Sequence, residues 1–121
     1  GALGNGAQDN KLVPSVVGRA RAIVTSGQAF HTCSLSNDGM LDCWGANDVA
    51  QIAESIATPN ILAPKRIALV TVTAAGAGGK HSCATTQDGS LWCWGSNADG
   101  QLGDGTTGGL SESPKRIAFC P

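Results

Sequence analysis

The stretch Cys43-Trp44-Gly45-Ala46-Asn47 returns fifty residues later as Cys93-Trp94-Gly95-Ser96-Asn97, with one substitution. The similarity extends to both sides without an insertion: His31, Cys33, Asp38, Gly39, Leu41, Gln51 and the run 64–68 are identical to His81, Cys83, Asp88, Gly89, Leu91, Gln101 and the run 114–118. A fixed period of about 20–50 residues is typical of a repeat protein, in which each copy packs on its neighbours. We therefore expect most of these shared positions to serve the fold.

The repeat divides the chain into two full copies, residues 22–69 and 70–121. Residues 1–21 correspond to the end of a preceding copy. Leu3-Gly4-Asn5-Gly6 matches the loop at 102–105, and Pro14 matches Pro114. We expect residues 1–21 to contribute a loop and a lone fourth strand.

Each copy contains four segments with the composition of short strands. They cover residues 22–25, 30–36, 40–44 and 65–69 in the first copy, and residues 70–73, 80–86, 90–94 and 115–119 in the second. The proline before each fourth strand opens that strand or lies at a sheet edge, because proline cannot donate to a strand ladder. Residues 49–57 are the only stretch with a weak helical period. The predicted fold class is all-β.

The second and third strands of each copy are predicted to form a tight hairpin. Asn37-Asp38-Gly39 and Gln87-Asp88-Gly89 are typical of three-residue turns with glycine in the left-handed position. A turn centred on Asp38 places Cys33 opposite Cys43, and the same symmetry places Cys83 opposite Cys93. Opposed Cβ atoms lie about 4.5–5.5 Å apart, so a modest twist brings them within the reach of a disulfide.

We therefore expect disulfides Cys33–Cys43 and Cys83–Cys93, which indicate an oxidising compartment. The alternative is that both pairs are reduced, small apolar core residues. A structural zinc site is disfavoured, because the chain lacks the Cys-x-x-Cys spacing. Cys120 has no counterpart in the first copy and is a candidate intermolecular thiol.

The composition disfavours two classes of partner. Eight basic and nine acidic residues leave no basic surface for nucleic acid. No apolar run approaches the roughly 20 residues that cross a bilayer, so we expect no membrane insertion.

The run His81-Ser82-Cys83-Ala84, then Asp88-Gly89, then the string 93–106 resembles the regulator of chromosome condensation repeat. The resemblance implies a β-propeller, usually of seven blades, each a four-stranded antiparallel sheet. It also implies a largely non-enzymatic, protein-binding family whose eukaryotic founder is a nucleotide exchange factor for a small GTPase on chromatin. The cysteine-bearing copies resemble those of secreted bacterial proteins. Residues 51–55 depart from the glycine-rich pattern, so a different loop shape is expected there.

Two full blades plus one extra strand cannot close such a ring, so we expect a partial propeller. An open stack of fewer than about three repeats is marginal alone. We therefore expect further blades, copies of the chain or a partner protein to complete it, rather than a free monomer.

The sequence offers no constellation of catalytic residues. His31 and His81 occupy the same repeat position, which indicates a ring nitrogen bonded to the backbone of a neighbouring strand or blade. No nucleophile elbow, phosphate loop or calcium loop is present, so we expect no enzyme, cofactor or metal. The candidate contact residues are Trp92, which replaces Asp42 of the first copy, and the recurring ledge of Lys65, Arg66, Lys115 and Arg116.

The function that these patterns favour is a non-catalytic protein-binding or scaffold module in a secreted or cell-surface protein, with the periplasm as a further location. The alternative is a self-assembling structural subunit that forms a ring or filament through exposed blade edges and Cys120.

Overall fold

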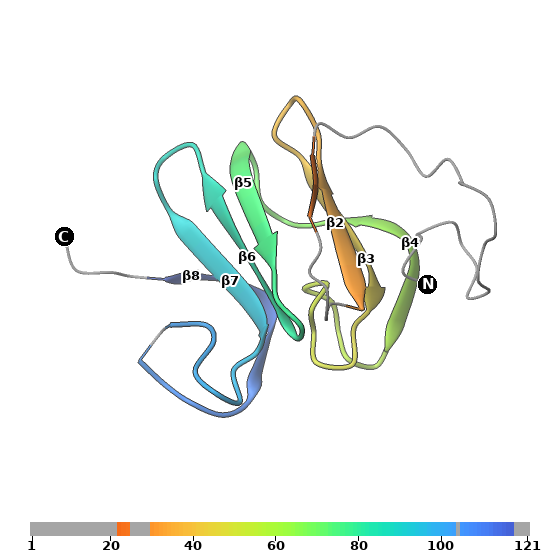
Figure 1. Ribbon diagram of the computed structural model, residues 1–121, viewed down its shortest axis with the longest axis vertical. Helices are drawn as coiled ribbons and strands as arrows, with labels where there is room; N and C mark the ends of the chain where they lie inside the picture. Colours follow the sequence, from red (N-terminus) through yellow and green to blue (C-terminus); the bar gives the residue numbers. More distant parts are fainter. Residues whose placement is uncertain (1–21, 25–29, 104, 118–121) are drawn as a thin grey trace.

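Two four-stranded antiparallel sheets make up the computed structural model, which describes residues 22–24, 30–103 and 105–117 (Figure 1). The first sheet contains β1 (Ala22–Val24), β2 (His31–Leu35), β3 (Leu41–Ala46) and β4 (Asn60–Arg66), and the second contains β5 (Val72–Ala77), β6 (His81–Thr86), β7 (Leu91–Ser96) and β8 (Leu110–Ile117). Strands adjacent in the chain are adjacent in each sheet. The predicted all-β fold with four-stranded blades is confirmed. The strand predicted within residues 1–21 lies outside the described residues, as does Cys120.

The fourth strands begin earlier than the sequence predicts. β4 and β8 start at Asn60 and Leu110 instead of residues 65 and 115, so each proline lies inside its strand. These strands are the outer edges of their sheets, where a missing N–H group is tolerated. In β4 the proline also lies in a bulge, because the register shifts between Cys43 and Gly45.

One further expectation about secondary structure is wrong. The first strand of the second repeat is β5 at 72–77, rather than residues 70–73, because pairing with β6 extends a strand into small residues of low β-propensity. Residues 49–57, the only stretch with a weak helical period, form successive turns and bends.

The hairpin register follows the predicted turn symmetry. Cys33 pairs with Cys43 and Leu35 with Leu41, and β6 and β7 repeat this register around Asp88. The N–H of Ser36 donates to the Met40 carbonyl over 2.9 Å. Hydrogen-bonded and non-hydrogen-bonded residue pairs alternate along an antiparallel ladder, so the cysteine pair is a non-hydrogen-bonded one. In this type of pair the Cα atoms approach most closely. The Cα atoms of both cysteine pairs are 4.1 Å apart.

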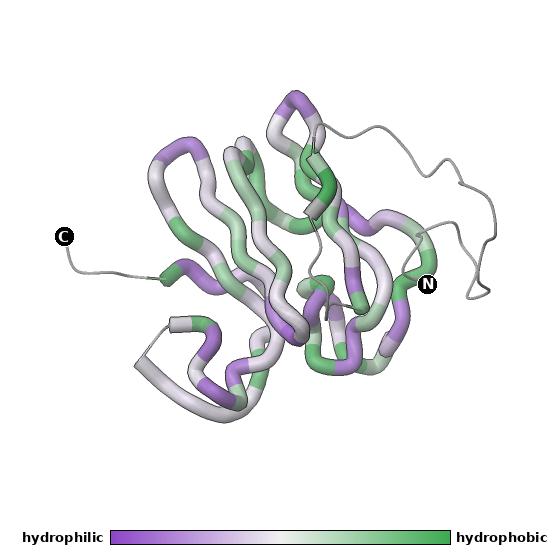
Figure 2. Tube along the Cα trace, in the orientation of Figure 1, coloured by the Kyte–Doolittle hydropathy of each residue, from purple (hydrophilic) through white to green (hydrophobic). Residues whose placement is uncertain are grey.

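One hydrophobic core lies between the two blades. It joins side chains of the first repeat to side chains of the second, namely Leu35, Leu41, Ile52 and Ile67 to Val72, Ala84 and Trp94. Figure 2 shows apolar residues along the strands and hydrophilic residues at the hairpin tips. Trp94 is fully buried and Trp44 nearly so. The blades therefore form a single packed unit.

Backbone hydrogen bonds also tie the blades together at the linker between β4 and β5. The N–H of Val72 donates to the Gly39 carbonyl, and the Thr71 carbonyl accepts from the Gln87 N–H, both over 2.9 Å. Thr71 has φ of 54°, which is unfavourable for a β-branched residue. A Cβ atom on Gly39 would lie 2.8 Å from the Cα of Thr71. The linker is therefore held tightly between the two hairpin turns.

The loops after β3 and β7 begin alike, contrary to the expectation of a different shape. Asn47 accepts from the Ile52 N–H through its side chain, and Asn97 accepts from the Leu102 N–H in the same way. Ala53 adopts φ of 56° where its counterpart Gly103 has 69°. The asparagine side chain imposes the turn, so an alanine is held in a conformation that suits glycine.

Candidate functional site

Both cysteine pairs are disulfide-bonded in the structure, Cys33 to Cys43 and Cys83 to Cys93. The first disulfide is buried between the blades, whereas Cys83 of the second is partly exposed. Each bond closes a short hairpin and contributes about 2–3 kcal/mol on the chain-entropy account.

A buried set of hydrogen bonds crosses from the first blade to the second. Ser82 Oγ lies 2.8 Å from His31 Nε2 and donates to the Gln51 carbonyl over 3.0 Å. The indole N–H of Trp94 donates to the same carbonyl over 2.8 Å. Because Ser82 uses its only proton toward Gln51, we assign the N–H of neutral His31 to Nε2. We call these four residues the inter-blade seam.

The seam gives His31 a structural role. The side chain is fully buried, and this burial, together with the charge of His81, lowers the pKa of His31 to about 4. The ring is therefore neutral near pH 7. The expected contact with the neighbouring blade exists, but the partner that the structure shows is the Ser82 hydroxyl rather than backbone.

A pocket of about 720 Å³ opens at the loop end of the blades. Its walls include Phe30, Asp48, Lys80 and His81. Phe30 is 74% exposed, and Asp48 and Lys80 supply opposite charges. The pocket has mixed polarity, with no feature that selects one sign of charge.

The predicted basic ledge differs between the two repeats. In the first, Lys65 Nζ lies 2.6 Å from a carboxylate oxygen of Glu54, and Arg66 Nε lies 2.5 Å from one of Asp42. The hydrogen bond from Lys65 lowers the pKa of Glu54, and the hydrogen bond to Asp42 raises the pKa of Arg66. The charges of Lys65 and Arg66 are thus paired within the chain.

Trp92 changes the ledge of the second repeat. It stands opposite Arg116 in the register in which Asp42 stands opposite Arg66. The guanidinium of Arg116 donates instead to Ser90 Oγ over 3.1 Å. Lys115 lies beside Arg116 in β8, opposite Cys93, and is exposed.

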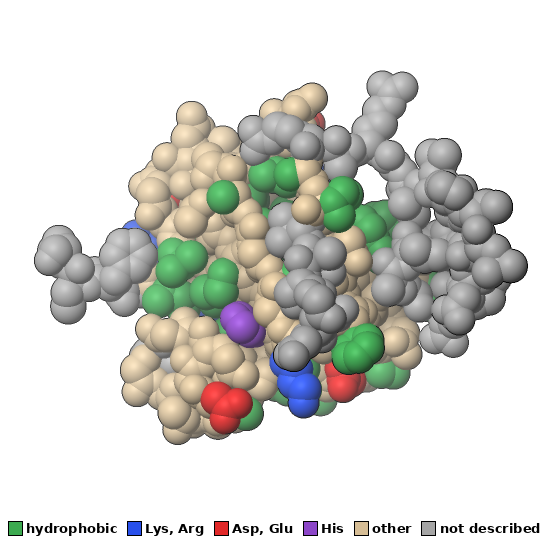
Figure 3. Space-filling view, viewed as in Figure 1, with side chains coloured by type: hydrophobic (Ala, Val, Ile, Leu, Met, Phe, Trp, Pro, Cys, Tyr) green, Lys and Arg blue, Asp and Glu red, His purple; other side chains and the backbone are tan. Residues whose placement is uncertain are grey.

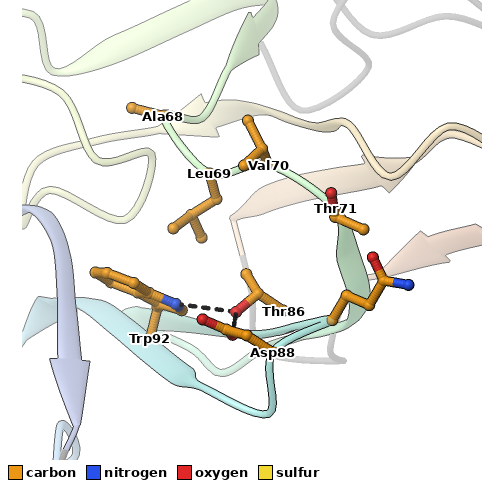
Figure 4. A pocket seen from close by; sticks show the side chains of 8 residues that line it. Ala68, Leu69, Val70, Thr71, Thr86, Asp88 and Trp92 are labelled. Carbon is orange, nitrogen blue, oxygen red and sulfur yellow. Dashed lines mark hydrogen bonds between the residues drawn. The ribbon is translucent and has the colours of Figure 1, made fainter.

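Beside Trp92 lies a second pocket, of about 380 Å³, between the linker and the β6–β7 hairpin (Figure 4). Its walls come from both segments: Ala68, Leu69, Val70, Thr71, Thr86, Gln87, Asp88 and Trp92. The indole N–H donates to Thr86 Oγ1 over 3.3 Å, and that hydroxyl donates to Asp88 over 2.6 Å. The aromatic ring is therefore fixed in position. We call this the Trp92 pocket.

The outer surface carries few charges on the face that Figure 3 shows, where apolar side chains form small groups. Val70, which lines the Trp92 pocket, is 70% exposed. Among residues 22–24, 30–103 and 105–117, no cluster of three or more metal-binding side chains occurs, and no helix has the length and apolarity that a membrane span requires.

Trp92 and the ledge are candidate contact residues from the sequence alone, whereas their neighbours in the structure were not predicted. Leu69 and Val70 fall in two predicted strands, 65–69 and 70–73, whereas in the structure they lie between β4 and β5 and line the pocket. The role of the Ser82 hydroxyl in the seam did have a signal in the sequence, because the counterpart of Ser82 in the first repeat, Thr32, also has a hydroxyl group. The acceptor in the seam is the main-chain oxygen of Gln51, which no side-chain pattern can reveal.

The chain is similar to models of the regulator of chromosome condensation repeat, one at residues 23–51 and 72–101 and another at residues 88–121. It is also similar to two crystal structures of Prp20p, the yeast RCC1. The first, from Saccharomyces cerevisiae, is described with its binding to Gsp1p and histones; it is 30% identical, has a TM-score of 0.63, and the match covers 74% of this chain and 22% of that one. The second, bound to Kap60, is 31% identical with a TM-score of 0.66, covering 75% and 21%.

The structure of human WBSCR16 shares the fold, with 24% identity and a TM-score of 0.71 over 85% of this chain and 27% of that one. This chain therefore matches about a quarter or less of the length of these proteins. No curated protein matches it.

Proposed function

The chain belongs to the regulator of chromosome condensation repeat family, and from this premise we propose that it is a non-catalytic module that binds another protein. The two yeast structures concern a relative described with protein partners, namely Gsp1p, histones and Kap60. The proposal extends protein binding, not those partners, to this chain.

The observation that carries the proposal is the Trp92 pocket on a rigid frame. Core packing, the seam and linker hydrogen bonds fix the two blades relative to each other. The pocket combines an immobilised indole with exposed apolar side chains. Aromatic side chains held in this way are typical of the centres of protein interfaces.

We further propose that the module works in an oxidising compartment, outside the cell, at its surface or in the periplasm. The two disulfides support this location, since such bonds persist where thiols are not kept reduced. The disulfide that closes one hairpin in each blade is also consistent with a secreted scaffold.

Photo-crosslinking tests the function. Benzoylphenylalanine replaces Val70 at the Trp92 pocket or, as a matched control, Phe30 at the opposite end, both strongly exposed. We expect the Val70 probe to capture one protein from the extracellular fraction, and that protein, once purified, to bind the unmodified chain in titrations. Failure of every captured protein to bind in titration contradicts the proposal, as does substrate turnover that is lost on His81→Ala.

The self-assembling subunit remains the second candidate. It is favoured by the outer edge strands β4 and β8, whose residues are largely exposed and could pair with another chain. Sedimentation velocity over a hundredfold concentration range, with and without reductant, separates the two. A defined oligomer supports self-assembly, whereas a monomer supports the binding module.

A further inference from the structure

The two repeats present the same arginine in two different settings. Arg66 and Arg116 occupy equivalent positions at the end of the outer strand, each opposite residue 42 or 92. Directly opposed side chains share one face of a sheet, with Cβ atoms about 4.5–5.5 Å apart. In the first repeat this placement brings Arg66 to the carboxylate of Asp42. The fold therefore directs this arginine toward the place where a carboxylate binds.

In the second repeat that carboxylate is missing from position 92. Within the described residues Arg116 forms no ion pair, and its Nε donates to the neutral hydroxyl of Ser90. A guanidinium group gains more from a charged acceptor than from a neutral one. The second repeat thus retains the arginine but lacks the acid that accompanies it in the first.

A nearby acidic residue does not prevent such pairing. The pKa of Asp38 is lowered by a hydrogen bond from Ser36 and, more weakly, by the charge of Arg66. The pKa of Asp88 is lowered by Thr86 and, more weakly, by Arg116. Each arginine therefore has a second carboxylate in its surroundings, Asp38 for Arg66 and Asp88 for Arg116. Because Arg66 still pairs with Asp42 in that setting, Arg116 can accept an acid as well.

The side chain that replaces Asp42 supplies an apolar contact instead. The Trp92 indole forms one wall of the Trp92 pocket and faces Leu69 in Figure 4, and Val70 of the linker also lines the pocket. A ligand with a carboxylate beside an apolar side chain could contact Arg116 and the pocket together. A single charged or a single apolar group would use only half of this surface.

We propose that Arg116 and the Trp92 pocket bind a protein segment that presents an acidic side chain next to an apolar one. The proposal rests on the protein-binding function above and names the chemistry of the partner. Asp42 is this chain's own example of the acid that the partner supplies.

The test uses a phage-displayed library of random peptides, selected on the whole chain and depleted on Trp92→Asp. That variant restores to the second repeat the carboxylate that Asp42 supplies to the first, so it should satisfy Arg116 internally. We expect the selected peptides to carry Asp or Glu within two residues of a large apolar residue. Labelled synthetic peptides then give dissociation constants by fluorescence anisotropy.

Arg116→Ala should weaken binding by about tenfold or more, which is the loss expected for one partner of a charged pair. Arg66→Ala is the matched control and should leave the dissociation constant unchanged, because Arg66 is paired with Asp42. Arg116→Glu should recover binding to a peptide whose acid is replaced by lysine. Thermal midpoints confirm that each variant is folded.

Several results would overturn this proposal. They are a selection that yields no peptide sensitive to Trp92→Asp, peptides without an acid, or equal affinity for Arg116→Ala and wild type. Self-association abolished by Trp92→Asp would assign the surface to a second copy instead. A parallel selection without the depletion step that yields only peptides that tolerate the Trp92 and Arg116 variants but lose binding on Phe30→Asp would refute this site and leave the protein-binding function standing.

Discussion

The buried His31 predicts that the blades lose stability in mild acid. Its pKa is about 4 in the folded chain, against an ordinary value of 6.5. The unfolded chain therefore binds the proton more tightly, so the contribution of His31 is complete above pH 6.5 and is lost as the pH falls toward 4. The difference between the two pKa values corresponds to about 3 kcal/mol.

Urea denaturation followed by tryptophan fluorescence, with the disulfides intact, measures this loss. Between pH 7 and pH 4.5 the free energy of unfolding should fall by about 2–3 kcal/mol. His31→Gln cannot titrate, yet its amide can still donate to Ser82. The variant should start less stable at pH 7 and change far less over this range.

The carboxylates with lowered pKa values, Asp38, Glu54 and Asp88, lose their contribution to stability as the pH falls through and below their ordinary values of 3.8, 4.5 and 3.8. Any loss that they cause above pH 4.5 is shared by wild type and His31→Gln and cancels in the comparison. His81→Gln serves as the control, because His81 lies outside the seam and only its charge acts on His31. An equal loss of stability in His31→Gln and wild type would refute the assignment of the acid sensitivity to this ring.

Three further predictions concern the backbone and the disulfides. Gly39→Ala should cost about 1–3 kcal/mol more than Gly89→Ala in thermal unfolding: the φ angles are alike at 81° and 84°, but only Gly39 has neighbouring backbone within 4 Å of an added Cβ. Ala53→Gly should leave stability unchanged or raise it by up to about 1 kcal/mol, since φ is 56°, whereas Ala74→Gly in strand β5 should lower it by about 0.5–1 kcal/mol; chemical denaturation compares the two. Under limiting reductant the disulfide of the second blade should open first, because Cys83 is partly exposed, and differential alkylation with mass spectrometry would detect the opposite order.

The hairpins were the most predictable part of the fold. A three-residue turn centred on Asp38 determines which residues face each other, so the pairing of Cys33 with Cys43 follows from counting along the chain. The same reasoning applies around Asp88. Local turn chemistry is strong here because glycine adopts the left-handed conformation at lower cost than other residues.

The rest depended on contacts outside the β2–β3 and β6–β7 hairpins, which local turn patterns do not encode. Residues 74–77 form a strand because β6 offers a ladder, although their composition is poor for strands. Ala53 takes a glycine-like conformation because Asn47 organises the whole loop. For the site, the sequence showed that Trp92 is not repeated, but only the structure shows that Leu69 and Val70 line the same pocket.

The inter-blade seam is asymmetric, because the two blades supply different groups to it. The first blade supplies an imidazole and a main-chain oxygen, and the second supplies a hydroxyl and an indole. A substitution of the Gln51 side chain leaves that main-chain oxygen in place. The inter-blade seam therefore tolerates a change of residue at this position of the first blade. A gene segment encoding one fifty-residue unit could then be duplicated or lost by recombination and still meet a compatible neighbour, which makes the number of blades easier to change than the joint between them.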